Sequence, residues 1–372
     1  MEPYVCRNID VSNPHMGGDW IYVGLDLGER IWVAGVLDLR TCTFSTKRFD
    51  SDDIWSEFFD WLLALKKTTA CHIHLLYEAG RQGFELARRL QADEIAVDIV
   101  ATSRLEKVRR KRKRGKSDRM DAKALTYMDW TDSRFPRVWI PNRDQEGMRN
   151  LLMWELTLES SLRRCRNRAV SILARWGVRY KPRMSLKAYN KLIDSLPEGA
   201  VGDIDLLRLQ CLRREEDFLR KELDEQELVR NHYFTRDAAI AKLMVWRGIG
   251  DKSARALAWY VGDWRRFPNG DSFSAYCGLT SVHSRSASSD RDRGVSKEGH
   301  RVLRRTMGQL ALCWQRWQPD CALVLATSKK VTGGKIARIA RTALARQLAV
   351  AIWKWMVNDE PIKGAIRTKP NR

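Results

Sequence analysis

The sequence lacks the cysteine and histidine patterns that hold zinc. It has no CxxC pair, no HExxH motif and no Cys/His cluster with ligand spacing. Its eight cysteines are scattered along the chain, which is typical of reduced and mostly buried thiols. His72 and His74 would share one face of a strand, but two histidines without a third ligand indicate a structural role. We therefore expect no zinc site.

Long apolar runs are also missing. No stretch approaches the roughly 18 apolar residues that a membrane-spanning helix needs, and the apolar segment 343–356 is interrupted by Arg346 and Lys354. The first twenty residues have neither the basic start nor the apolar centre of a secretion signal. We expect a cytoplasmic protein without a membrane partner.

Acidic residues are outnumbered. The chain has 67 Lys and Arg against 46 Asp and Glu, a formal net charge of +21. That excess is larger than solubility requires and predicts an anionic partner, for which nucleic acid is the better candidate than a membrane surface. With 44% hydrophobic residues in 372, the chain is long enough to fold as two or three domains.

Residues 20–142, which follow an N-terminal extension at 1–19, alternate between strand-like and helix-like segments. Strands are predicted at 20–27, 31–39, 41–49, 72–79 and 96–102, with a turn at 28–30. Helical periodicity marks 56–67, 83–92 and 118–128. A meander followed by strands alternating with helices predicts an α/β domain whose mixed sheet is covered by helices.

Residues 143–235 are predicted to be helical. Apolar residues recur there at alternating steps of four and three, namely Leu158, Leu162, Cys165, Ala169, Ile172 and Trp176. This spacing is the narrow seam of a coiled coil or helical hairpin. A second charged helix, roughly 205–231, could pair with the first within the chain or between subunits, and the sequence leaves both open.

Residues 236–372 form a nearly all-helical segment. Gly248 and Gly250 enclose a turn between two short helical patterns, which resembles a helix-hairpin-helix whose backbone N–H groups approach a phosphate. Glycine turns between helices also occur for packing reasons alone. A polar loop at 280–300 is followed by a helix carrying Leu303 to Trp317 and by a last helix at 334–356.

Four carboxylates stand where a metal site could form. Asp26 and Glu78 end two apolar strands, and Asp118 and Asp121 share one face of a helix. Each alone is more simply explained as a turn residue or a helix cap. Their order along the chain is harder to explain in that way. It favours a ribonuclease-H-like nuclease core, in which a pair of Mg²⁺ ions acts on a phosphodiester.

A basic run directly precedes Asp118. Its positively charged members are Arg109, Arg110, Lys111, Arg112, Lys113, Arg114 and Lys116. Such runs are often solvated faces or localisation signals. Its position favours a contact with the nucleic-acid backbone that brings a phosphate to the metals.

The segment from Ser281 to Ser289 contains five serines. The residues His283, Arg285, Arg291 and Arg293 lie among or next to them. Serine-rich loops are most often only flexible. The sharper hypothesis is a nucleophilic serine with arginines that stabilise the attacked phosphate, and periodicity does not choose among the five.

Taken together, several segments resemble the DEDD-type insertion-sequence transposases, which are related to the Piv-type DNA invertases and include bridge-RNA-guided recombinases. They read GLDLG at 24–28, YEAG at 77–80, KSDRMDAKAL at 116–125 and FPNGDSFSAYCGL at the start of 267–307. The resemblance implies a RuvC-like domain at 20–142, a coiled-coil region at 143–235 and a C-terminal transposase domain at 236–372.

The resemblance also assigns roles to residues. Asp26, Glu78, Asp118 and Asp121 match the metal-binding tetrad, and a gap-free count from Gly278 places the essential serine at Ser286. Ala287 stands where the family usually has glycine, and Ser284 and Ser288 lie nearby.

Cofactors and partners follow from the same resemblance. It implies two Mg²⁺ ions, with Mn²⁺ as a substitute, and double-stranded DNA from element ends and target as substrate. A guide RNA, a homodimer or homotetramer, and a prokaryotic cytoplasm with association to the nucleoid are also implied.

Three functions remain open, in this order. The first is a DNA recombinase or transposase that uses Ser286 and the tetrad. The second is a metal-dependent nuclease or Holliday-junction resolvase that forms no covalent intermediate. The third is a non-catalytic DNA- or RNA-binding protein, which the departure at Ala287 suggests.

Overall fold

A computed structural model describes residues 19–80, 82–101, 118–131, 137–179, 186–234, 237–286, 289–295, 299–328 and 334–368. The chain divides into two compact units, residues 1–141 and 142–372. Each unit is described by itself.

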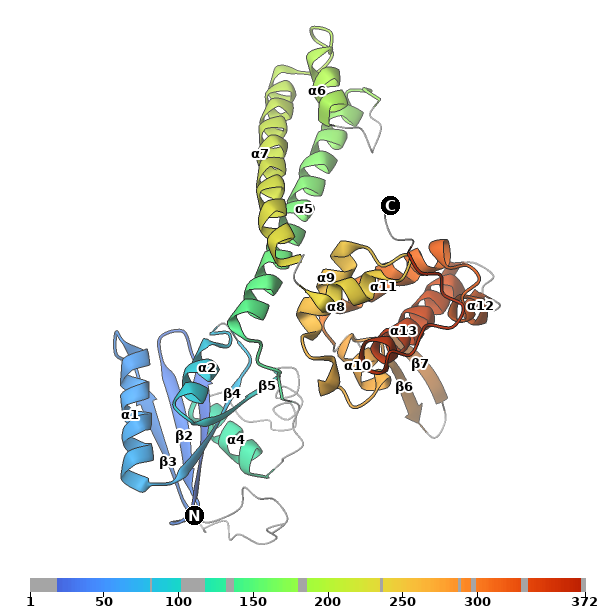
Figure 1. The fold of residues 1–372 in the computed structure, drawn as a ribbon. Helices are drawn as coiled ribbons and strands as arrows, with labels where there is room; N and C mark the ends of the chain where they lie inside the picture. The colour runs from blue at the N-terminus through green and yellow to red at the C-terminus, as the bar shows by residue number, and fades with distance from the viewer. Residues whose placement is uncertain are drawn as a thin grey trace. The chain divides into compact units, whose positions relative to one another are not determined.

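The first unit is built on a five-stranded mixed sheet (Figure 1). Its strands are β1 (Trp20–Leu27), β2 (Trp32–Asp38), β3 (Thr43–Phe49), β4 (His72–Glu78) and β5 (Ala96–Val100), in the order β3-β2-β1-β4-β5. Neighbours β3, β2 and β1 are antiparallel, whereas β1, β4 and β5 are parallel. The predicted mixed sheet is confirmed, and each strand begins and ends within about three residues of its expected position.

Helices cover both faces of this sheet. They are α1 (Ile54–Thr69), α2 (Glu85–Ala92) and α4 (Asp118–Thr131). Alternate residues of a strand face opposite sides. The odd-numbered Leu25 and Leu75 share a core with Phe58 of α1 and Leu86 of α2, whereas Leu76 packs with α4 on the other side. The face formed by even-numbered residues of β1 and β4 is therefore the one that α4 covers.

Two glycines let α4 approach the sheet closely. Gly24 of β1 and Gly35 of β2 are paired across the ladder. The buried Thr126 Oγ1 accepts a hydrogen bond from the Gly24 N–H (3.1 Å) and donates toward the Gly35 carbonyl (3.0 Å). A Cβ on Gly24 would lie 2.2 Å from the Thr126 backbone nitrogen and 2.5 Å from the Ala122 oxygen. No residue larger than glycine fits without moving α4.

The second unit begins with a helical hairpin. Helix α5 (Arg143–Arg175) starts with a capping box between Asn142 and Gln145 and runs antiparallel to α7 (Asp203–Phe234), while α6 (Leu186–Asp194) lies near the connecting end (Figure 1). Of the predicted seam, Leu158, Cys165, Ala169 and Ile172 are buried and Leu162 is half-buried. The two helices thus pair within the chain. Trp176 does not belong to the seam, because it is 44% exposed and donates its indole N–H to Asp205.

The remaining helices form a compact bundle. They are α8 (Ala238–Met244), α9 (Asp251–Val261), the 3-10 turn η1 (Trp264–Arg266), α10 (Gly270–Tyr276), α11 (Arg301–Trp317), α12 (Ala322–Ser328) and α13 (Gly334–Asn358). Their core is rich in tryptophan, including Trp246, Trp259, Trp314 and Trp353. With Trp264, five of the fifteen tryptophans of the chain therefore fill space in this core.

The segment expected to be a polar loop is partly ordered as strands. Strands β6 (Ser281–Ser286) and β7 (Ser289–Val295) form an antiparallel pair, which we call the serine hairpin. The loop prediction was wrong here because serines and charged residues carry no apolar alternation to mark a strand.

The apolar stretch near the C-terminus lies in α13, where Leu344, Leu348 and Ile352 are fully buried in the helical core. Within the described ranges, no helix has both the length and the apolar character needed to span a bilayer.

We expect Gly24→Ala to lower the free energy of unfolding by about 3 kcal/mol, because the added Cβ meets backbone atoms of α4. The matched control is Gly147→Ala in α5, where nothing lies within 4 Å of the added Cβ. There alanine should stabilise the helix by about 0.5–1 kcal/mol. Urea unfolding followed by circular dichroism measures both; equal midpoints for the two variants would contradict the close contact.

Candidate active site

Asp26 and Glu78 lie at the same edge of the sheet. The parallel register of β1 and β4 pairs Leu25 with Tyr77, so that Asp26 and Glu78 follow at the same level. The carboxyl ends of parallel strands meet at one edge, and this is where open sheets commonly place ligand-binding residues. Both residues are partly exposed and even-numbered, which puts them on the face that α4 covers.

Asp118 and Asp121 lie in the first turn of α4. Asp118 is exposed, whereas Asp121 is only 7% exposed and directly precedes Ala122, whose carbonyl oxygen contacts the glycine pair. The close approach of α4 therefore holds the backbone next to Asp121 against β1, the strand that ends in Asp26. The structure brings all four tetrad residues to the same side of one sheet.

The shared position of the four carboxylates does not by itself make a metal site. Across the described parts of the chain, no three His, Cys, Asp or Glu side chains are arranged so that they could hold a metal ion. In donor chemistry the four carboxylates fit Mg²⁺, which prefers hard oxygen ligands. The four-residue magnesium site stays a prediction.

The predicted basic contact, from Arg109 to Arg114 together with Lys116, lies outside the described residues. The structure therefore describes α4 only from Asp118 onward.

The serine hairpin places Ser286 at the end of β6. Ser286 pairs with Ser289, Arg285 with Asp290, and Ser284 with Arg291. Ala287 and Ser288 between the strands lie outside the described residues, and Arg293 lies in β7. Ser286 is thus the last residue of β6.

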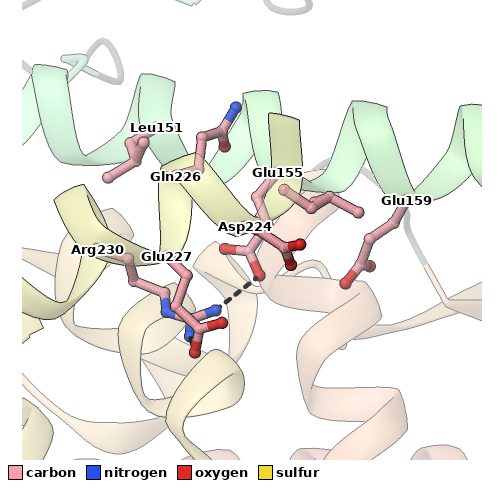
Figure 2. Close-up of a pocket in the computed structure, with 8 residues that line it drawn as sticks. Leu151, Glu155, Glu159, Asp224, Gln226, Glu227 and Arg230 are labelled. Atoms are coloured by element: carbon pink, nitrogen blue, oxygen red, sulfur yellow. Dashed lines mark hydrogen bonds and ion pairs between the residues drawn. The ribbon is translucent and has the colours of Figure 1, made fainter. Parts of the chain in front are cut away.

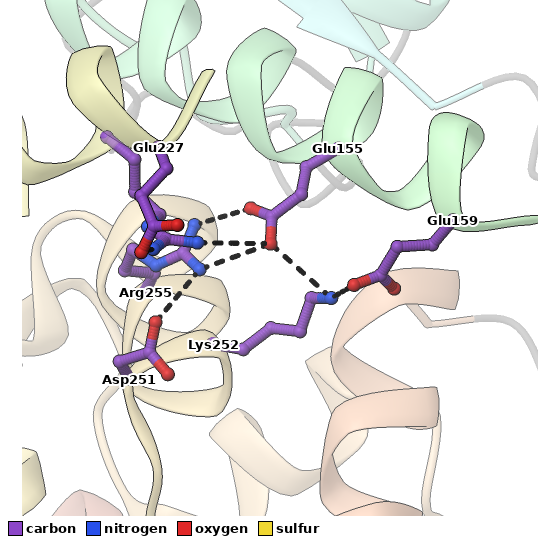
Figure 3. Close-up of polar contacts among 7 residues, drawn as sticks. Glu155, Glu159, Glu227, Asp251, Lys252 and Arg255 are labelled. Atoms are coloured by element: carbon purple, nitrogen blue, oxygen red, sulfur yellow. Dashed lines mark hydrogen bonds and ion pairs between the residues drawn. The ribbon is translucent and has the colours of Figure 1, made fainter. Parts of the chain in front are cut away.

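The turn with Gly248 and Gly250 joins α8 to α9. Gly248 has a φ of 102°, which favours glycine, and Gly250 is the N-cap residue of α9. Figure 3 shows that Glu155 and Glu159 of α5 reach toward the first turn of α9. These carboxylates complement the positive end of the helix dipole. The nearby carboxylates of Glu155 and Glu159 do not support the predicted phosphate contact of this turn, which stays a prediction.

Comparison with known proteins shows which protein family the chain resembles. Residues 240–325, from α8 to α12, match the family described as "Transposase IS116/IS110/IS902 family". Over 319 residues the chain is 31% identical to "Putative transposase y4rJ" from Sinorhizobium fredii (strain NBRC 101917 / NGR234), with 80% of each chain covered. The chain belongs to this transposase family. A second protein of the same organism, "Putative transposase y4qE", is 22% identical over 78% of this chain and 77% of its own length.

Membership of the family gives the transposase DNA as its substrate and supports the insertion-sequence resemblance. The matched region contains the glycine turn, the serine hairpin and all of α11. The identity of the nucleophile and of the metal ligands goes beyond what this match states.

An ion network that the sequence did not reveal joins α5 to α9 (Figure 3). The Arg255 guanidinium, 1% exposed, donates to Glu155 at 2.7 Å and to Asp251 at 3.1 Å. Lys252 pairs with Glu155 at 3.4 Å and more closely with Glu159. Charges this deeply buried are costly unless paired. Burial by itself raises the pKa of Glu155, but the hydrogen bond from Arg255 and the neighbouring positive charges outweigh it, so the pKa lies below its usual value.

A cavity of about 170 Å³ adjoins this network (Figure 2). Its walls are Leu151, Glu155, Glu159, Leu223, Asp224, Gln226, Glu227 and Arg230. Four lining residues are acidic and one is basic, so a phosphate would be repelled there.

A second missed cluster lies at the base of the serine hairpin. The ring of His300, just before α11, lies 4.4 Å from the Tyr260 ring, and the backbone N–H of His300 donates to the Tyr276 carbonyl. Arg149 donates to the carbonyl oxygens of Trp259 and Tyr260. Burial, together with the charges of nearby arginines, lowers the pKa of His300 to about 4. The imidazole is therefore neutral at pH 7.

Glu155→Gln should cost about 3 kcal/mol of stability at pH 7, because it leaves the buried Arg255 with only the half-exposed Asp251 as a charge partner. The control Glu227→Gln removes a carboxylate that is 53% exposed and pairs with Arg230, and should cost less than about 1 kcal/mol. Because the pKa of Glu155 is lowered on folding, its contribution is present above the unfolded pKa and is lost as pH falls through the folded pKa. Urea midpoints at pH 7 and in acid test this, and a constant difference between Glu155→Gln and wild type would contradict it.

His300→Gln should flatten the pH dependence of stability between about pH 6.5 and 4. In this window the unfolded chain takes up a proton at His300 while the folded chain does not. Lowering the pH from about 6.5 to 4 should therefore reduce the free energy of unfolding of the wild type by up to about 3 kcal/mol through His300. Thermal unfolding of both proteins across the window measures the slopes. Parallel profiles would show that His300 is not held neutral.

Proposed function

We propose that the transposase cuts and rejoins DNA strands through a serine-linked intermediate, with Ser286 as nucleophile and the carboxylate tetrad as the metal-binding part of the site. The observation that carries the proposal is the placement of Asp26 and Glu78 at one level of neighbouring strands, beneath the helix that contains Asp121. Family membership supplies the DNA substrate.

In the proposed reaction the Ser286 hydroxyl oxygen attacks a DNA phosphorus atom. A bond forms between Oγ and phosphorus, the bond from phosphorus to one deoxyribose oxygen breaks, and that oxygen leaves with the serine proton. Attack by a hydroxyl of another DNA strand reverses these changes and releases Ser286. Since each step exchanges one phosphate ester for another, cutting and joining need no external energy source.

Mg²⁺ held by Asp26, Glu78, Asp118 and Asp121 would neutralise charge that develops on the phosphate. The protein's own contribution is positional. Packing at Gly24 holds the start of α4 against β1, which keeps Asp121 on the side of the sheet where Asp26 and Glu78 end.

A guide RNA and an assembly of two or four subunits also belong to the proposal. The net charge of +21 supports the binding of more than one polyanion, here DNA and a guide RNA. The serine and the tetrad lie in different compact units of the chain, which is compatible with the two coming from different subunits.

A second candidate is a metal-dependent nuclease or junction resolvase. It is favoured by the presence of all four carboxylates in the unit 1–141, separate from the serine hairpin. In that mechanism water attacks the phosphate and Ser286 is dispensable.

Ser286→Ala should abolish both strand joining and the covalent DNA–protein adduct, because it removes the attacking oxygen. Incubating purified protein with labelled element-end DNA and Mg²⁺, followed by denaturing electrophoresis and mass spectrometry, detects the adduct. Ser284→Ala, in the same strand, is the matched control and should retain it. Asp121→Asn, of equal size, should lose the adduct while still binding DNA.

The outcomes separate the candidates. The nuclease would be established if no adduct forms and if Ser286→Ala still cleaves DNA whereas Asp121→Asn does not. An adduct on Ser284 or Ser288 would keep the mechanism and correct the residue. Chelation of Mg²⁺ should stop the reaction, and Mn²⁺ should restore it.

A further inference from the structure

Trp317, the last residue of α11, differs from the buried tryptophans of the same bundle. It is 40% exposed, whereas Trp246, Trp259 and Trp314 are each at most 2% exposed. Two guanidinium groups lie over its ring: Arg247 at 4.9 Å and Arg316 at 5.1 Å from the ring centroid. Arg247 comes from the glycine turn, so two distant segments build one exposed aromatic and cationic surface, which we call the Trp317 clamp.

The charges of the clamp are not used inside the protein. Neither Arg247 nor Arg316 forms an ion pair with any described carboxylate. Arg255 shows the contrast, because it also lies over a tryptophan ring, that of Trp259, but its guanidinium is held by Glu155 and Asp251. An exposed aromatic ring between unpaired guanidiniums is suited to a ligand that combines a flat ring with negative charge.

The clamp continues a basic face of α11. Arg301, Arg305 and Arg316 are exposed on this helix, and its sequence contains no acidic residue. For Arg301 and Arg305, too, the described part of the chain supplies no ion pair. The helix has 17 residues, a length of about 25 Å. At the duplex rise of about 3.4 Å per nucleotide along the axis, this length corresponds to about seven nucleotides, and to fewer of an extended single strand.

This face begins next to the serine hairpin. β7 ends at Val295 and α11 starts at Arg301. Val295 pairs with Ser281, so α11 starts at the end of the hairpin opposite Ser286, and a nucleic-acid strand that follows α11 would run from that end to Trp317. The DNA substrate of the transposase family and the absence of acidic residues in α11 argue for DNA as the occupant.

We propose that the Trp317 clamp and the exposed face of α11 bind a single-stranded segment of the DNA substrate, with one unpaired base stacked on Trp317 and phosphates at Arg247 and Arg316. The proposal rests on the function proposed above, which opens DNA strands near Ser286. A base displaces one guanidinium from the ring, and that guanidinium then contacts a phosphate. The exchange is favourable because a base–aromatic stack is stronger than an exposed cation–π contact. A duplex cannot use the ring, because its bases are already stacked.

Four fluorescein-labelled probes of 20 units test the proposal with the full-length protein: oligo-dT, an abasic strand with the same phosphates, oligo-U and duplex DNA. Trp317→Leu should weaken oligo-dT binding about 5- to 150-fold and leave the abasic strand unchanged. Trp317→Phe, which keeps a ring, should retain most of the affinity. The double variant Arg247→Gln/Arg316→Gln should weaken both strands and reduce the slope of log K against log salt by about 1.4.

Controls come from the helical hairpin. Trp154 of α5 is 50% exposed, and no guanidinium from the described part of the chain lies over its ring, so Trp154→Leu should bind as wild type does. Arg163→Gln, also on α5 and exposed, is the control for lost charge. Equal weakening of oligo-dT and the abasic strand by Trp317→Leu would overturn the stacking role. A loss confined to oligo-U would assign the surface to RNA, a loss confined to duplex would assign it to paired DNA, and either would overturn the proposal.

The two proposals fail separately. If wild-type protein binds oligo-dT through Trp317 but forms no serine adduct and joins no strands, the proposed function fails and the clamp stands. If Ser286-dependent joining occurs while Trp317→Leu binds all four probes as wild type does, the clamp fails and the function stands.

Discussion

The contact between α4 and the glycine pair of the sheet is the constraint on which the candidate active site depends. Strand ends deliver Asp26 and Glu78 to one edge whatever the helix does, because parallel register decides it. Asp121 reaches that side only because Gly24 and Gly35 leave room for the helix backbone. A Cβ at Gly24 would lie 2.2 Å from the Thr126 backbone nitrogen, so a larger residue there requires α4 to move, and Asp121 would move with it.

In the second unit, the ion network around Glu155 and Arg255 fixes one helix against another, as the glycine contact does in the first unit. Here ion pairs hold the helices together instead of close backbone packing. Arg255 is 1% exposed and Glu155 is 7% exposed, so neither could be buried alone. Together they attach α5 of the helical hairpin to α9 of the bundle. The same network brings acidic groups to the first turn of α9, where the helix dipole favours them over a bound phosphate. A phosphate at this turn would have to compete with those carboxylates.

Much of the first unit could be predicted from the sequence, because buried strands show apolar runs and their final Asp or Glu stands out. Asp26 and Glu78 were found in this way. Gly24 and Gly35 carried a signal that was not used, since glycine inside a strand often marks a close approach. The network could not be predicted, because Glu155 and Arg255 are 100 positions apart and each alone resembles an ordinary helix residue. The serine hairpin was missed for want of apolar alternation.

A chain of net charge +21 has many basic side chains, and their number alone does not locate an interface. What separates them is whether a carboxylate already holds them. Arg255, Lys252 and Arg230 are committed to Glu155 and its neighbours. Arg247 and Arg316, by contrast, lie over an exposed ring and pair with no carboxylate among the residues that the structure describes. A polyanion gains most where it does not have to displace an internal partner, so the surface of α11 is better suited to nucleic acid than the more charged surroundings of α9.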